Sequence, residues 1–176
     1  MTKLQVAAAA AVLALFASGA SAQGFNYDAY QPTTLYEAKA EFIEVARQPI
    51  SGRPGAFLTS YFNQGGQRWR AQATYSGKSR PLDAEELKFV RDWLKSSQRD
   101  ELADIFVDSH LFTLDGAEYW LPVQAPVAKF FPKELKPGDK IDLYLVEIGG
   151  TRRGDHWLWL PLVSEFRKIE EDASPP

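Results

Sequence analysis

The sequence contains no cysteine, one methionine at its first position and only two histidines. Without thiols the chain can form neither disulfides nor thiolate-held metal sites, so its stability must come from packing. His110 and His156 lie too far apart in the chain to form a recognised metal motif, and no acidic run has calcium-loop spacing. We therefore expect neither a metal centre nor a bound cofactor.

A strongly basic character is also missing. The chain has 20 lysines and arginines against 23 aspartates and glutamates, which gives a formal net charge of -3. A general nucleic-acid binder needs a basic face that neutralises phosphates. We therefore expect no nucleic-acid partner, although this balance leaves room for a local basic patch.

Long hydrophobic runs are scarce, and the clearest one lies near the N-terminus. Residues 6–17 are apolar, follow the positive charge of Lys3 and precede small residues at positions 20–22. This pattern predicts a signal peptide over residues 1–22 that is cleaved after Ala22. The run is shorter than the roughly 20 residues that cross a bilayer, and no second run follows. We expect a protein without a membrane span after cleavage, periplasmic or secreted, and the alanine-rich leader suggests a bacterium.

Three further segments are expected after the leader. Residues 23–33 are polar and aromatic without a clear period, which predicts an extended N-terminal arm. Residues 34–169 have the length of a single domain with one core. Residues 170–176 are acidic and end in two prolines, which predicts a flexible tail.

Two helices are predicted from capping signals and apolar spacing. Thr34 and Glu37 have the spacing of a capping box, and the apolar residues that follow share one helical face, which predicts a helix over residues 35–47. Asp83 precedes an acidic first turn and a second periodic run, which predicts a helix ending near residues 95–98. Residues 126–135 are expected to form a short helix limited by proline.

The strand-like runs are mostly paired by turn residues. Residues 56–62 and 67–75 flank a glycine-containing segment, and residues 107–114 and 118–124 flank an Asp-Gly turn. Together with the runs at 141–145 and 157–163, they predict an α+β fold. Its antiparallel hairpins would form a small curled sheet or partly open barrel with two or three helices. Oligonucleotide/oligosaccharide-binding folds have a comparable helix between strands, but no motif here is diagnostic of them.

Two features are candidates for ligand recognition. Residues 149–155 are predicted to form a glycine-rich loop in which Arg152 and Arg153 present planar donors to an anionic ligand, or a charged hairpin tip exposed to solvent. Tyr119 and Trp120 belong to a group of aromatic residues that could stack on sugar rings or an apolar partner, or could fill the core.

No complete catalytic constellation is visible. His156 follows Asp155, but adjacent residues on a strand point to opposite faces, and no Gly-x-Ser-x-Gly elbow occurs. We assign no catalytic residue. The sequence favours a soluble, exported, non-catalytic binding or assembly module of the bacterial cell envelope, with an envelope component or anionic glycan as partner. The alternative is an exported hydrolase that acts on an envelope polymer, with His156 or carboxylates as acid or base.

Overall fold

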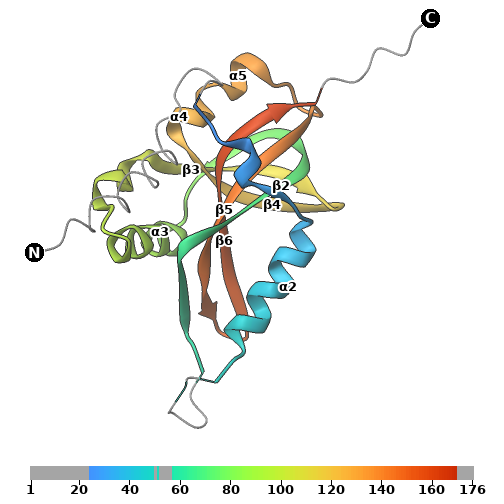
Figure 1. Cartoon of the computed structure of the whole chain (residues 1–176). Helices are drawn as coiled ribbons and strands as arrows, with labels where there is room; N and C mark the ends of the chain where they lie inside the picture. The colour runs from blue at the N-terminus through green and yellow to red at the C-terminus, as the bar shows by residue number, and fades with distance from the viewer. Residues whose placement is uncertain (1–23, 50, 52–56, 170–176) are drawn as a thin grey trace, which may run out of the picture.

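The computed structural model describes residues 24–49, 51 and 57–169 (Figure 1). The predicted leader and the predicted tail lie outside the described residues. The described part is a mixed α/β structure, and no helix in it is long and apolar enough to cross a membrane. Its helices are α2 (Leu35–Ala46), α3 (Ala84–Ser96), α4 (Ala125–Ala128) and α5 (Phe131–Glu134), with the 3₁₀ helices η1 (Tyr27–Ala29) and η2 (Asp100–Ile105). Its strands are β1 (Gln31–Pro32), β2 (Ser60–Pro81), β3 (Phe106–Leu114), β4 (Ala117–Gln124), β5 (Lys140–Arg153) and β6 (His156–Lys168).

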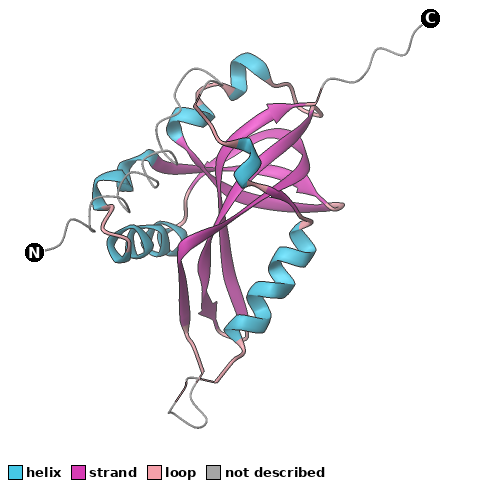
Figure 2. Ribbon diagram, in the orientation of Figure 1, coloured by secondary structure: helices cyan, strands magenta, loops and turns pink. Residues whose placement is uncertain are grey.

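The six strands form one sheet in the order β1-β2-β3-β4-β6-β5 (Figure 2). Because β2 also pairs with β5, the five longer strands close into a ring. Most neighbours in the ring are antiparallel, as expected for strands joined by hairpins. The exception is a single parallel pair between Val123 of β4 and Val163 of β6.

The first predicted hairpin, over residues 56–62 and 67–75, is wrong. Residues 60–62 of the first run and residues 67–75 both belong to the single strand β2, which pairs with β5 in one direction on both sides of residues 63–66. The register moves from Phe62 opposite Gly149 to Gln67 opposite Glu147, so the segment between them is a bulge. Gly66 has a φ of 61°, and this conformation occurs in bulges as well as in tight turns that reverse the chain. The strand continues because β5 offers partners on both sides of the bulge.

The hairpins formed by β3 and β4 and by β5 and β6 are confirmed. Asp115 and Gly116 have φ values of 50° and 79° and connect β3 to β4, as expected for an Asp-Gly turn. The predicted loop over residues 149–155 is mostly strand, because β5 continues to Arg153 and β6 begins at His156. Gly149 has a φ of 106°, and a Cβ there would lie 1.9 Å from the Tyr61 carbonyl oxygen. This glycine permits a close strand approach.

Both predicted long helices are confirmed by their caps. The Thr34 and Asp83 side chains each accept the backbone N–H three residues ahead, and the glutamate at that position accepts the backbone N–H of the cap residue. The predicted short helix is divided into α4 and α5. The N-terminal arm is only partly extended, because it includes η1 and β1 and buries Phe25 and Tyr30.

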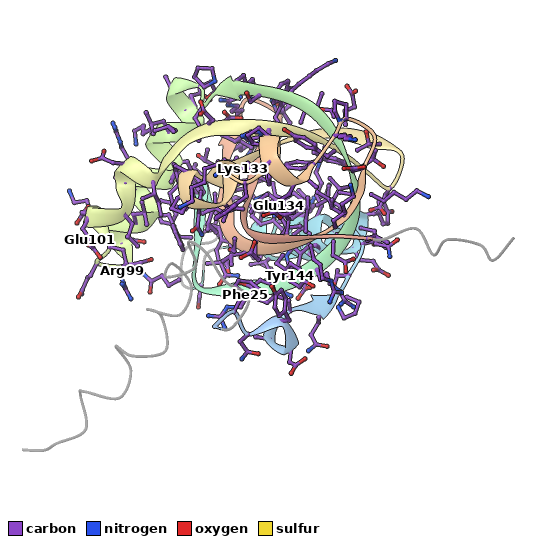
Figure 3. All side chains as sticks on the ribbon, turned by 90° about the horizontal axis from the view of Figure 1, so that it is seen from above. Phe25, Arg99, Glu101, Lys133, Glu134 and Tyr144 are labelled. Carbon is purple, nitrogen blue, oxygen red and sulfur yellow. The ribbon has the colours of Figure 1, made fainter. Side chains whose placement is uncertain are left out.

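Two apolar cores lie on opposite faces of β5 and β6. The first contains side chains from all five ring strands, and α2, α4 and α5 contribute to it. The second is covered by α3 and the N-terminal arm. In Figure 3, Phe25 of the arm lies beside Tyr144 of β5, and their ring centroids are 5.5 Å apart. Strands β5 and β6 therefore lie between the two cores, and α2 and α3 are attached to them through the first and the second core respectively.

Candidate functional site

A pocket of about 460 Å³ lies between α2 and the tip of the β5–β6 hairpin. We call it the α2–hairpin pocket. Helix α2 and its C-cap residue Arg47 contribute two cations and an aliphatic side chain, and the hairpin contributes charged, imidazole and indole groups. Phe57, which precedes β2, adds an aromatic ring. The lining residues are Lys39, Ile43, Arg47, Phe57, Arg152, Asp155, His156 and Trp157.

The charges of α2 are sorted by helical face. Lys39, Ile43 and Arg47 follow one another at four-residue intervals, which places them on one side of the helix. The three glutamates of α2 follow a different face, and one of them, Glu41, accepts a hydrogen bond from Gln67 of β2 at 3.1 Å. Phe42 is buried and holds the helix against the sheet. The helix therefore presents its cations to the pocket and its carboxylates elsewhere.

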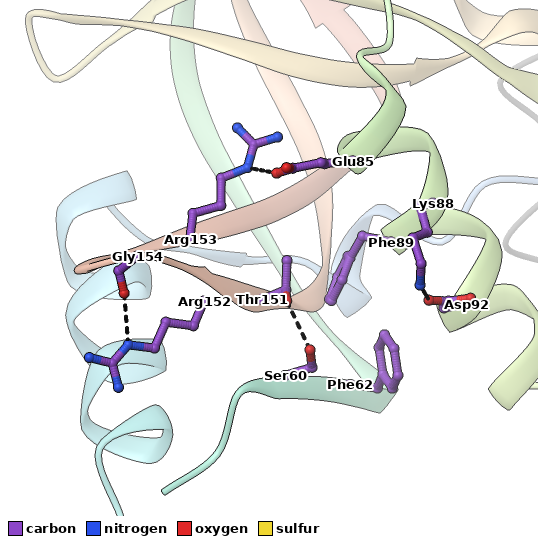
Figure 4. A pocket seen from close by; sticks show the side chains of 10 residues that line it. All are labelled: Ser60, Phe62, Glu85, Lys88, Phe89, Asp92, Thr151, Arg152, Arg153 and Gly154. Atoms are coloured by element: carbon purple, nitrogen blue, oxygen red, sulfur yellow. Dashed lines mark hydrogen bonds and ion pairs between the residues drawn. The ribbon is translucent and has the colours of Figure 1, made fainter.

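The two predicted arginines lie on adjacent positions of β5 and diverge. Consecutive residues of a strand point to opposite faces. In Figure 4, Arg152 and Arg153 extend in opposite directions from the hairpin. Arg152 is exposed, and its Nε donates to the Gly154 carbonyl oxygen at 3.0 Å. It forms no ion pair with any carboxylate of the described residues, and it lines the α2–hairpin pocket.

Arg153 is bound to α3. Its guanidinium lies 3.2 Å from an Asp83 carboxylate oxygen and also pairs with Glu85. Partial burial of Asp83 acts to raise its pKa, but the backbone donors of α3 and the Arg153 guanidinium outweigh it, and the pKa is lowered. Arg153 therefore fastens the hairpin to the first turn of α3, whereas Arg152 is available to a ligand.

A second pocket, of about 470 Å³, lies between α3 and the hairpin (Figure 4). Its charges compensate one another, since Lys88 pairs with Asp92 at 2.5 Å and Arg153 pairs with Glu85. The Ser60 and Thr151 hydroxyls are also within 2.8 Å of each other. Arg152 lines this pocket too, but it is the one cation there without an ion pair to a described residue. The α2–hairpin pocket adds Lys39 and Arg47 to Arg152, which makes it the better candidate for an anionic ligand.

The structure does not bring Tyr119 and Trp120 to the α2–hairpin pocket. Both are half-buried on β4, and neither is among the residues that line that pocket. The Arg80 guanidinium lies 5.0 Å from the centroid of the Trp120 ring, and Tyr119 packs against the first core. The aromatic ring that does line the pocket is Trp157, which makes an edge-to-face contact with Phe42 at 5.4 Å.

The two histidines have different surroundings. His110 is buried in β3, and burial lowers its pKa while the nearby Asp108 acts to raise it. Its ring makes an edge-to-face contact with Phe131 at 4.9 Å. His156 is exposed and lines the α2–hairpin pocket together with Asp155. Asp155 lies in the turn, so the alternation expected within a strand does not separate these two side chains.

Sequence reasoning missed the contribution of α2. Lys39 and Arg47 are eight residues apart, a spacing that indicates one helical face, and this signal was present in the sequence. Their meeting with Arg152 and Trp157 depends on how α2 docks against β6, which is a contact between segments distant in the chain. Among the described residues, no group of three or more His, Asp or Glu side chains could hold a metal ion.

Comparison with known proteins adds no assignment to this geometry. The site is therefore interpreted from its own residues: several cations, one carboxylate, one imidazole and an aromatic wall. No family model matches the chain, and no curated protein or solved structure was found to be similar to it.

Proposed function

We propose that this protein is a soluble, exported, non-catalytic binding or assembly module of the bacterial cell envelope, and that it takes an anionic ligand in the α2–hairpin pocket. Export rests on the predicted leader. The observation that carries the ligand class is the pocket lining, whose described residues include the three cations of Lys39, Arg47 and Arg152 and one carboxylate, that of Asp155. In this proposal the ring of strands serves as a small, partly open barrel that holds the two sides of the pocket in place.

The electrostatics support this ligand class. The chain as a whole has a formal net charge of -3, so a pocket with an excess of cations is opposite in sign to the chain as a whole. A concave cluster of like charges raises the local concentration of its counter-ion. Guanidinium groups bind carboxylates and phosphates through paired donors, and such charge-assisted hydrogen bonds are stronger than neutral ones. An anion would therefore gain both attraction and orientation from Arg47 and Arg152.

The apolar side of the pocket narrows the ligand further. Trp157, Phe57 and Ile43 supply a wall on which the C–H face of a sugar ring or another apolar group can rest. A simple inorganic anion would use the cations and leave this wall uncovered. The pocket is therefore suited to an acidic envelope glycan, which offers both kinds of surface.

The test is a binding titration of the mature protein with acidic cell-wall fragments, followed by intrinsic tryptophan fluorescence and calorimetry. We expect saturable binding that weakens as salt concentration rises. Arg47→Ala and Arg152→Ala should each lower the affinity about tenfold or more, since each removes a charge-assisted hydrogen bond. Arg91→Ala, at an exposed arginine of α3, is the matched control and should bind as the wild type does. Equal affinities for all four proteins would reject the pocket.

A hydrolase remains the second candidate because His156 and Asp155 line the same pocket. In that case His156 would act as acid or base on a polymer held by the cations. Release of new chain ends from wall polymers by the wild type, lost in His156→Ala, would favour this candidate. Binding without turnover in the wild type would exclude it.

A further inference from the structure

We infer that the ligand is an extended acidic polysaccharide that leaves the α2–hairpin pocket along α2 and stacks one of its sugars on Tyr36. This inference rests on the proposed function and deepens it from an anionic ligand to a polymer with a defined path. The path consists of the pocket and the pocket-side face of α2, and we call it the α2 track.

The first observation is the exposure of Tyr36. It is 77% exposed, the highest value among the large hydrophobic side chains described as exposed. A tyrosine ring can stack on a sugar or another apolar group while its hydroxyl stays in water. Tyr36 lies on α2, whose buried face is formed by other residues, so its ring is not needed to attach the helix to the sheet.

The second observation is the alignment of Tyr36 with the pocket. At 100° per residue, Tyr36, Lys39, Ile43 and Arg47 fall within one narrow stripe of the helix. The stripe is roughly 16 Å long, since each helical residue rises about 1.5 Å. The stripe is longer than a single sugar ring. Lys39, Ile43 and Arg47 of this stripe also line the pocket. Tyr36 is not among the residues that line the pocket, so a ligand that stacks on it extends beyond the lining.

The third observation is the order of chemical groups along the track. Along α2 an aromatic ring is followed by a cation, an aliphatic group and a second cation. Trp157 and Arg152 line the pocket together with the last three of these groups. An acidic polysaccharide repeats apolar ring faces and carboxylates in a similar alternation. Polyphosphate has the charges but no apolar face, and a neutral glycan has the faces but no charge. The glutamates of α2 lie off the track, so they keep a polyanion on this side of the helix.

The experiment uses oligogalacturonates of increasing length, in which every sugar carries a carboxylate, and the mature full-length protein. For the wild type we expect affinity to rise with chain length until the track is filled. Tyr36→Ala should lower the affinity for long oligomers about tenfold, within the range of one lost stacking contact, and leave the disaccharide unchanged. Tyr36→Phe keeps the ring and should bind as the wild type does. Because the side chain is exposed, both variants should retain the wild-type far-UV circular dichroism.

The outcomes separate this inference from the proposed function. If Tyr36→Ala binds long oligomers as the wild type does while Arg152→Ala still weakens the disaccharide, the track is wrong and the pocket stands. If no oligomer of any length binds, both fail. Equal binding of neutral chitin oligosaccharides would overturn the acidic class. Single-stranded DNA that binds as tightly as the long oligomers, with the same dependence on Tyr36, would overturn the polysaccharide in favour of a nucleic acid.

Discussion

Glu147 is the residue whose ionisation is most strongly altered by the fold. It lies on β5, is 3% exposed and is among the few buried charged side chains described. Burial raises its pKa from 4.5 to about 7, with the Trp159 indole opposing this change and Glu41 adding to it. Desolvation penalises the carboxylate because the surrounding medium screens charge less well than water. The folded protein therefore holds a proton at this position more tightly than the unfolded chain does.

This property predicts a pH-dependent stability. The pKa of Glu147 is higher in the folded state than in the unfolded state. The contribution of protonated Glu147 to the free energy of unfolding is therefore complete below about pH 4.5 and is lost as pH rises through about 7. The loss amounts to about 3 kcal/mol, at 1.36 kcal/mol per pKa unit. Glu147→Gln should flatten this part of the profile and be more stable than the wild type near pH 8. Urea unfolding of both proteins at several pH values measures this change in stability.

The control for this prediction is Glu44→Gln, which neutralises an exposed glutamate of α2. It should keep the wild-type slope of stability against pH. If Glu147→Gln shows the same slope as the wild type and Glu44→Gln, the pKa of Glu147 is the same in the folded and unfolded chains, which would contradict the prediction.

At the scale of elements, individual side chains fasten α2 and α3 to hairpins. The Asp115 carboxylate, in the β3–β4 turn, accepts the backbone N–H of Leu35 at the start of α2 at 2.9 Å. Arg153, at the end of β5, pairs with Asp83 and Glu85 at the start of α3. The Asp115 carboxylate complements the N-terminus of α2. The Arg153 guanidinium complements the acidic residues at the start of α3. These contacts fix the helices relative to the ring.

Arg152 and Arg153 should therefore separate binding from stability. Arg153→Ala removes the fastening of α3 and should lower the free energy of unfolding by about 1 kcal/mol, the upper range for exposed ion pairs. Its affinity for the ligand should stay at the wild-type value. Arg152→Ala should show the reverse, with reduced affinity and unchanged stability. Urea unfolding and the titration above measure the two properties, and a loss of both in one variant would contradict this division.

Local signals in the sequence were sufficient for elements whose start and end are chemically marked. The capping boxes at Thr34 and Asp83 identify α2 and α3, and the Asp-Gly turn identifies the β3–β4 hairpin. The segment ending at Gly66 was misread because a glycine with positive φ occurs in bulges and turns alike. Pairing with β5 decides between them, and that pairing is long-range.

The candidate site could be predicted only in part for the same reason. The sequence places Arg152 and His156 at a charged hairpin tip, and both residues line the pocket. Trp120, from the second candidate feature, does not line the pocket, because it lies on β4 and packs with Arg80. Lys39 carries a helical signal, but its role depends on the docking of α2 across the sheet. Contacts of this kind follow from the ring closure and leave no mark on local sequence.

At the scale of the molecule, the two cores share β5 and β6. Strand β5 directs Leu143 and Leu145 into the first core and Tyr144 and Val146 into the second. Neither core can lose its packing without exposing one face of the same two strands. We therefore expect the described body to unfold as one cooperative unit.

Matched substitutions in the two cores test this expectation. Leu114, in the first core, and Leu94, in the second, are both fully buried. Leu114→Ala and Leu94→Ala should each lower the free energy of unfolding by about 2 to 5 kcal/mol, the range for a leucine cavity. Each variant should still unfold in a single transition that coincides by tryptophan fluorescence and far-UV circular dichroism. Two separate transitions in either variant would show that the cores are independent.

The buried segment 141–150 of β5 has a consequence for how this protein can change over generations. Each of these ten residues is buried, so replacement by a larger or charged side chain disturbs packing. The groups around the α2–hairpin pocket lie on the surface, where exchange costs little stability. Descendants of this chain can therefore acquire new ligand preferences by altering a handful of outer positions while the central strand keeps its present composition.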